Sequence, residues 1–115
     1  YPDNILAKDF LGGILVSLGE YRRAEEVYGS LLELDPSYSR AHEGMGNVCL
    51  NLGRGDEAEF HYMKAISLSP NAPDPYYNLA GLYCKRGDNE KAMKWFGEAV
   101  RRGFKDMEFA KRDPD

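Results

Sequence analysis

Cysteine is scarce in this chain of 115 residues, and the two cysteines that it contains, Cys49 and Cys84, are far apart in the sequence. No Cys-x-x-Cys pair and no cluster of histidine with cysteine accompanies them, which argues against the common zinc and redox motifs. Both fall within stretches that we expect to be helical. We therefore predict free, partly buried thiols and no metal ion or other cofactor.

An excess of positive charge is also missing. Lysine and arginine number 15 against 19 acidic residues, which gives a net charge of −4. A nucleic-acid reader usually carries a basic stripe, so we predict no nucleic-acid partner. No apolar run approaches the roughly 18 residues that span a bilayer, and no signal peptide is visible. We predict no membrane insertion, and the cytoplasm is only slightly favoured because the compartment stays open.

Sequence motifs of catalysis are absent too. No nucleophile elbow, phosphate-binding loop or metalloprotease motif occurs. Gly44-Met45-Gly46 lacks a third glycine and falls inside an expected helix, and Arg54-Gly55-Asp56 fills an expected turn. We expect His42 at a half-buried packing position and His61 at the surface. These features predict that the chain is not itself an enzyme.

What the sequence does contain is a repeat of 34 residues. Proline, glycine, alanine and an aromatic residue each recur at this spacing: Pro2, Pro36 and Pro70; Gly19, Gly53 and Gly87; Ala24, Ala58 and Ala92; Tyr28, Tyr62 and Phe96. A period of 20 to 50 residues is typical of stacked units that cannot bury their apolar faces alone. The repeat favours binding on a surface over catalysis.

Each unit has two stretches with apolar residues at three- and four-residue spacing, which predicts two amphipathic helices. The first stretches are about 6–18, 40–52 and 74–86, and the second are about 21–34, 55–68 and 89–102. Glycine just past a helix end readily takes the left-handed conformation. Because the breaks are short, the two helices of each unit must fold back as an antiparallel pair.

Small residues mark the expected contact between the paired helices: Gly12, Gly46 and Ala80 on the first and Ala24, Ala58 and Ala92 on the second. Large residues are expected to fill the space around that contact, namely Leu11, Met45 and Leu79 with Tyr28, Tyr62 and Phe96. Proline then ends each unit, because it cannot continue a helix.

These positions resemble the tetratricopeptide repeat. The strongest matches are Leu11-Gly12, Ala24, Tyr28 and Pro36; Met45-Gly46, Ala58, Tyr62, Ala65 and Pro70; and Tyr76, Leu79-Ala80, Tyr83, Ala92, Phe96 and Ala99. Lys8 and His42 depart from the first aromatic position, and Phe104 stands where proline is expected. The resemblance implies an all-α, right-handed superhelical solenoid of antiparallel helix pairs.

The same alignment predicts the organisation of the chain. We expect the tail end of a preceding repeat at 1–4, repeats at 5–38, 39–72 and 73–106, and a capping helix with the chain end at 107–115. Since Pro2 occupies the proline position of a repeat whose other residues are missing, we expect the chain to be a fragment of a longer protein.

In the family that the chain resembles, the first helix of each unit lines a concave groove. The positions that this implies as a candidate peptide groove are Asp9, Arg40, Glu43, Asn47, Asn51, Asp74, Tyr77, Asn78 and Lys85. An asparagine amide can pair with a peptide backbone in both directions. Some members grip a C-terminal carboxylate with basic residues, but none stands at the matching positions Asp9, Gly13, Gly44, Asp74 and Asn78. The acids favour a neutral or basic ligand.

The resemblance and the repeat together predict a non-catalytic protein–protein interaction module that binds a peptide or protein segment in this groove. The alternative is a structural spacer or self-association unit of a larger protein, and we expect weak self-association through the N-terminal repeat face. A regulatory domain of an enzyme elsewhere in the parent chain stays open as a third class.

Overall fold

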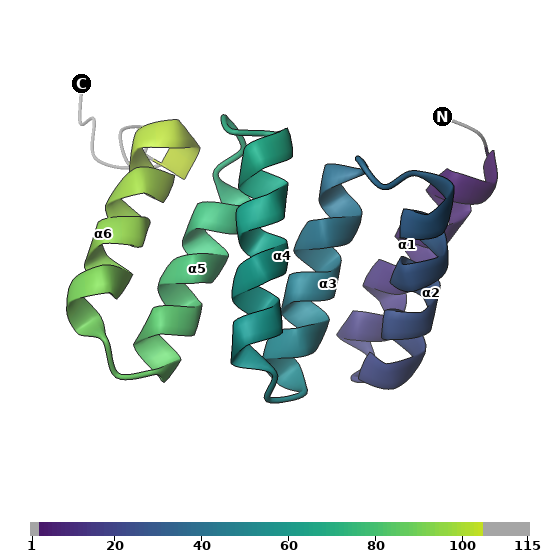
Figure 1. Cartoon of the computed structure of the whole chain (residues 1–115), viewed down its shortest axis with the longest axis horizontal. Helices are drawn as coiled ribbons and strands as arrows, with labels where there is room; N and C mark the ends of the chain where they lie inside the picture. Colours follow the sequence, from purple (N-terminus) through teal and green to yellow (C-terminus); the bar gives the residue numbers. More distant parts are fainter. Residues whose placement is uncertain (1–2, 105–115) are drawn as a thin grey trace, which may run out of the picture.

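The computed structural model describes residues 3–104 as a row of three antiparallel helix pairs (Figure 1). The helices are α1 (Asp3–Ser17), α2 (Tyr21–Leu34), α3 (Ser39–Asn51), α4 (Gly55–Leu68), α5 (Asp74–Lys85) and α6 (Asn89–Ala99), followed by a π-helical turn, η1 (Val100–Phe104). The described residues contain no strand, which confirms the predicted all-α class. The expected capping helix, 107–115, lies outside the described residues.

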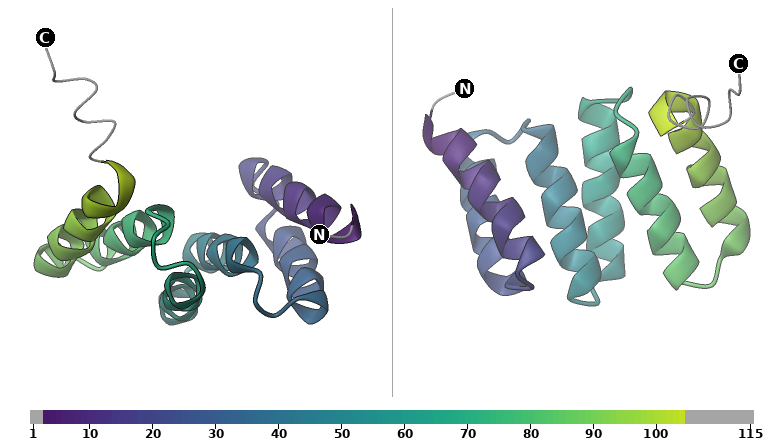
Figure 2. Two further views of the ribbon diagram at one scale, coloured as in Figure 1. Left: turned by 90° about the horizontal axis from the view of Figure 1, so that it is seen from above. Right: turned by 180° about the vertical axis from the view of Figure 1, so that it is seen from behind.

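The pairs follow one another along the long axis of the molecule, as the views from above and from behind show (Figure 2). Helices α1 and α6 therefore lie at opposite ends of the row, while α3 and α4 have a helix pair on each side (Figure 1). This placement decides which apolar side chains find a partner.

A glycine closes each tight turn between paired helices. Gly19, Gly53 and Gly87 have φ angles of 78°, 79° and 81°, the left-handed region that only glycine adopts without a Cβ penalty. After the first of them, the Glu20 amide donates to the carbonyl oxygen of Leu15 at 2.8 Å. The predicted antiparallel pairing is confirmed, and the same type of turn joins the two helices in each of the three pairs.

The small residues predicted at the helix contacts are confirmed at their positions in the first two units. A Cβ added at Gly12 would come within 2.6 Å of the Tyr28 ring, and one at Gly46 within 2.6 Å of the Tyr62 ring. Ala24 and Ala58 are completely buried.

Two large residues that we expected in the core are instead exposed. Leu11 is 46% exposed and Phe96 is 39% exposed. Both lie on the end helices of the row, where no further helix pair covers them among the described residues. The repeat position therefore fixes the helix face, and the place in the row decides the burial.

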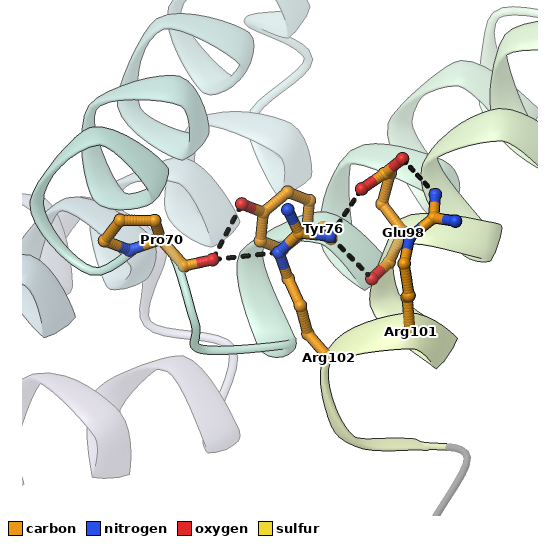
Figure 3. Close-up of polar contacts among 5 residues, drawn as sticks. All are labelled: Pro70, Tyr76, Glu98, Arg101 and Arg102. Carbon is orange, nitrogen blue, oxygen red and sulfur yellow. Dashed lines mark hydrogen bonds and ion pairs between the residues drawn. The ribbon is translucent and has the colours of Figure 1, made fainter.

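An arginine ties the C-terminal turn to the preceding repeat (Figure 3). The Arg102 Nε donates to the carbonyl oxygen of Pro70 at 2.9 Å, and the Tyr76 hydroxyl donates to the same oxygen at 2.8 Å. The guanidinium carbon lies 4.2 Å from the centroid of the Tyr76 ring, and Arg102 also pairs with the Glu98 carboxylate. These contacts fix the end of α6 against the start of α5.

Candidate binding groove

A hollow of about 720 Å³ lies between α1 and α3. Most of its lining comes from these two first helices, with Tyr28 from α2, and Ala72 and Asp74 beside or at the start of α5. The lining residues are Asp9, Phe10, Gly13, Ile14, Ser17, Leu18, Tyr28, Arg40, Glu43, Gly44, Asn47, Ala72 and Asp74. We call this hollow the α1–α3 pocket.

The nine predicted groove residues divide among three places. The α1–α3 pocket brings together Asp9, Arg40, Glu43, Asn47 and Asp74. A second hollow of about 300 Å³ holds Tyr77 and Asn78, together with Leu50, Ala80, Gly81, Cys84, Ala92, Met93 and Phe96. Asn51 and Lys85 are exposed and line neither of these two hollows.

Asp9 joins α1 to the second helix pair. The residue is 9% exposed, and its carboxylate accepts a hydrogen bond of 2.7 Å from the Tyr38 hydroxyl and lies 3.1 Å from the Arg40 Nε. The Arg40 side chain is itself 75% exposed and extends over the pocket. Since its charge is already matched, Asp9 contributes to the fold more than the sequence suggested.

Glu43 is a half-buried carboxyl group in the pocket lining. Within the described residues, the Glu43 carboxyl accepts one long side-chain hydrogen bond, of 3.5 Å from the Asn78 Nδ2. Burial and the neighbouring Asp74 raise the Glu43 pKa to about 7, against the opposing effect of Arg40. The carboxyl is therefore partly protonated at neutral pH. Burial and the negative charge of Asp74 both disfavour its ionised form.

Asn47 and Asn51 serve the scaffold. The Tyr62 hydroxyl donates to the Asn47 Oδ1 at 2.5 Å, and burial raises the Tyr62 pKa, so the hydroxyl keeps its proton. The Asn51 Nδ2 donates to the Asn47 carbonyl oxygen at 2.8 Å. The Tyr62 bond engages the Asn47 side-chain oxygen, and the Asn51 bond engages the Asn51 amide, so neither group is free to pair with a peptide backbone as predicted.

Three exposed apolar side chains, from α1 and the turn directly after it, form the other part of the pocket lining. Phe10 is 75% exposed, Ile14 42% and Leu18 70%. The groove prediction missed Ile14 and Leu18 because their repeat equivalents, such as Val48, are core positions. The unusual breadth of apolar residues around α1 was the signal that could have identified them.

A histidine pair was also missed. His42 is buried, with its Nε2 2.9 Å from the Pro36 carbonyl oxygen and its Nδ1 3.2 Å from the Nδ1 of His61. His61 is half-buried, so the expectation of a surface position was wrong. Burial and then the nearby His42 lower the His61 pKa, because both disfavour its charged form.

The predicted thiols are free, but only one of them is buried. Cys49 lies in the core, whereas Cys84 is exposed beside the second hollow, which corrects the expectation that both are partly buried. The described residues hold no group of three or more side chains that could bind a metal ion. None of the described helices is long and apolar enough to cross a membrane.

Known sequences match this architecture. One sequence model of the tetratricopeptide repeat matches residues 11–73, and another matches residues 61–94. Cell division cycle protein 27 homolog A of Arabidopsis thaliana is 37% identical over 71 residues, 62% of this chain and 10% of that protein. Anaphase-promoting complex subunit 3 of Schizosaccharomyces pombe is 26% identical over 82 residues, 71% of this chain and 12% of that protein. The chain thus spans about a tenth of the length of these relatives.

Solved structures share the fold. MamA superposes with a TM-score of 0.78 at 25% identity, over 90% of this chain and 61% of that one. SycD of Yersinia enterocolitica, in complex with a peptide of the translocator YopD, gives 0.84 at 22% identity, over 96% of this chain and 85% of that one. These likenesses confirm the predicted right-handed solenoid. The first sequence model covers more than half of the chain, from within α1 to the loop before α5. The chain belongs to the tetratricopeptide repeat family.

Proposed function

We propose that this chain is a protein-interaction module that binds a segment of a partner protein in the groove of its first helices, without a reaction of its own. The observation that carries the proposal is the α1–α3 pocket, which combines exposed apolar side chains with a few polar groups. This mixture is typical of surfaces that bind ligands in concave sites.

The scaffold supports such a role because its groove is already formed. Helices fixed by tight glycine turns and buried hydrogen bonds need little reordering when a segment binds, which lowers the entropic cost of association. SycD, a protein of the same fold, is known in complex with a peptide. The acids of the lining favour a neutral or basic segment, and the net charge of −4 disfavours nucleic acid.

Blocking the groove tests the proposal. A Cβ at Gly13 would meet nothing within 4 Å, so Gly13→Trp places an indole in the α1–α3 pocket without disturbing the helix packing. Gly97 on α6 is also open, with nothing within 4 Å, and lines neither hollow, so Gly97→Trp is the matched control. Both variants should keep the wild-type circular dichroism spectrum.

The probes are peptides selected from a random phage-displayed library on the immobilised wild-type chain. We expect the selected peptides, once synthesised, to bind wild type and Gly97→Trp alike and to lose most of their affinity for Gly13→Trp. Failure to enrich any peptide, or equal binding to all three proteins, would reject the groove as the binding site.

A second candidate, the spacer or self-association unit, is favoured by one comparison within the chain. Leu11 is 46% exposed, whereas its repeat equivalents Met45 and Leu79 are 9% and 0% exposed. The outer face of α1 therefore carries a side chain suited to contact another helix pair, and α6, at the other end of the row, exposes Met93 and Phe96 that could meet it in a second copy.

Light scattering over a wide concentration range tests this candidate. If copies stack end to end, the apparent mass should rise with concentration, and Leu11→Glu should abolish the rise. Leu34→Glu, at another exposed leucine, is the control and should associate like wild type. A chain that stays monomeric at every concentration contradicts the stacking of copies.

A further inference from the structure

The α1–α3 pocket has two chemically different walls. One wall consists of the exposed apolar side chains Phe10 and Ile14 of α1 and Leu18 of the turn directly after it. The opposite wall carries the carboxyl groups of Glu43, on α3, and Asp74, at the start of α5. A single ligand that fills this pocket meets both walls.

Neither the Glu43 nor the Asp74 carboxyl group is paired with a cation among the described residues, although Arg40 lies near enough to Glu43 to favour its charged form. Arg40 itself pairs with Asp9. Two carboxylates that repel each other, one of them half-buried, form a site that a cation would stabilise.

We propose, building on the function above, that the α1–α3 pocket selects a basic–apolar segment: a lysine or arginine between Glu43 and Asp74, and a large apolar side chain against Phe10, Ile14 and Leu18. Charge complementarity selects the cation. Burial of apolar area against Phe10, Ile14 and Leu18 adds a non-directional gain in affinity. An acidic segment would instead add to the repulsion.

Proton uptake should regulate this selection. The titratable and polar groups around Glu43 come from five helices: Asp9 on α1, Tyr28 on α2, Arg40 on α3, Tyr62 on α4, and Asp74 and Asn78 on α5. Burial, then Asp74 and more weakly Asp9, raise the Glu43 pKa to about 7 against the opposing effect of Arg40, so the carboxyl loses its charge in mildly acidic solution. A bound cation favours the ionised form, so binding releases a proton and strengthens as pH rises through 7.

Fluorescence anisotropy with defined probes tests the proposal. The probes are fluorescein-labelled peptides in a glycine–serine background, each with one arginine and one leucine separated by zero to four residues. Control probes replace the arginine by glutamate or the leucine by serine. We expect the best basic–apolar probe to bind at pH 8 about tenfold or more tightly than either control, the range of a charge-assisted contact.

Variants locate the two walls. Glu43→Gln should weaken the basic–apolar probe severalfold at pH 8 and flatten its pH dependence, whereas Glu90→Gln, an exposed acid on α6, should leave both unchanged. Phe10→Ala should weaken binding of the basic–apolar probe and leave the pH dependence of that binding in place. Equal binding of the arginine and glutamate probes, or an unaltered pH profile in Glu43→Gln, overturns the inference.

The groove-blocking variant separates this failure from failure of the proposed function. If Gly13→Trp abolishes binding of library-selected peptides that show no basic–apolar preference, the groove binds segments but its selectivity is not the one proposed. If Gly13→Trp leaves the selected peptides bound, the groove itself is rejected.

Discussion

Tyr28 is held between two glycines from different helix pairs. An added Cβ would lie 2.6 Å from its ring at Gly12 of α1 and 2.3 Å from it at Gly44 of α3. The ring is only 5% exposed. Because both neighbours approach so closely, the ring cannot move away from one without meeting the other, and the two glycines set the spacing between the first and second repeats.

This contact predicts the effect of one methyl group. Gly44→Ala should lower the free energy of unfolding by about 1–2 kcal/mol, the usual cost of overpacking, despite the better helix propensity of alanine. Gly29→Ala is the control, because nothing lies within 4 Å of its Cβ position, and it should raise stability by about 0.5–1 kcal/mol. Urea unfolding followed by circular dichroism measures both, and a Gly44→Ala variant as stable as wild type contradicts this packing.

The histidine pair predicts a stability loss in acid. The His61 pKa is lowered in the folded state, so the unfolded chain binds the proton more readily, and stability falls as pH drops from about 6.5. Glu43 acts in the opposite direction, because its raised pKa favours the folded state below about 7.

Comparison with His61→Phe isolates the histidine contribution, since both proteins retain Glu43. Phenylalanine keeps an aromatic ring beside His42 but cannot titrate. The melting temperature of wild type should fall more than that of His61→Phe between neutral pH and pH 5. Parallel pH profiles would show that the pair does not couple protonation to folding.

At the scale of an element, the end of α6 shows what local sequence could not supply. The amphipathic pattern predicted a helix to residue 102, but the α-helix ends at Ala99 and the chain continues as a π-helical turn. The Arg102 side chain reaches Pro70 and Tyr76 from this turn, contacts across more than twenty residues of sequence. Helix periodicity carries no information about such a partner.

The same contacts predict different roles for two adjacent arginines. Arg102→Ala should lower the free energy of unfolding by about 1–2 kcal/mol, because it loses two hydrogen bonds to carbonyl oxygens, an ion pair and the stacking on Tyr76. Arg101→Ala removes only an exposed ion pair with Glu98 and should cost less than about 0.5 kcal/mol. Thermal melting of the two variants measures the difference, and equal losses would mean that the stacked arrangement is not stabilising.

At the scale of the whole molecule, the 34-residue period was enough to predict the helix pairs, their turns and the fold. Each of these depends on local pattern and on glycine, both of which the sequence displays. The site was predicted less completely, because it depends on long-range contacts. Asp9 meets Tyr38 and Arg40 of the next unit, and Ile14 is exposed only because its helix ends the row.

Position in the row also predicts how the molecule opens. Helix α3 has a helix pair on each side and seven of its residues are buried, whereas in α6 only Ala99 is buried among the described residues. Stability in repeat arrays is close to a sum of unit and nearest-neighbour terms, so the end pairs can open while the central pair stays folded. Amide hydrogen exchange should therefore be slowest in α3 and α4 and faster in α1 and α6. Exchange at one common rate in all six helices would instead mean that the row unfolds only as a whole, so that loss of either end pair unfolds the centre with it.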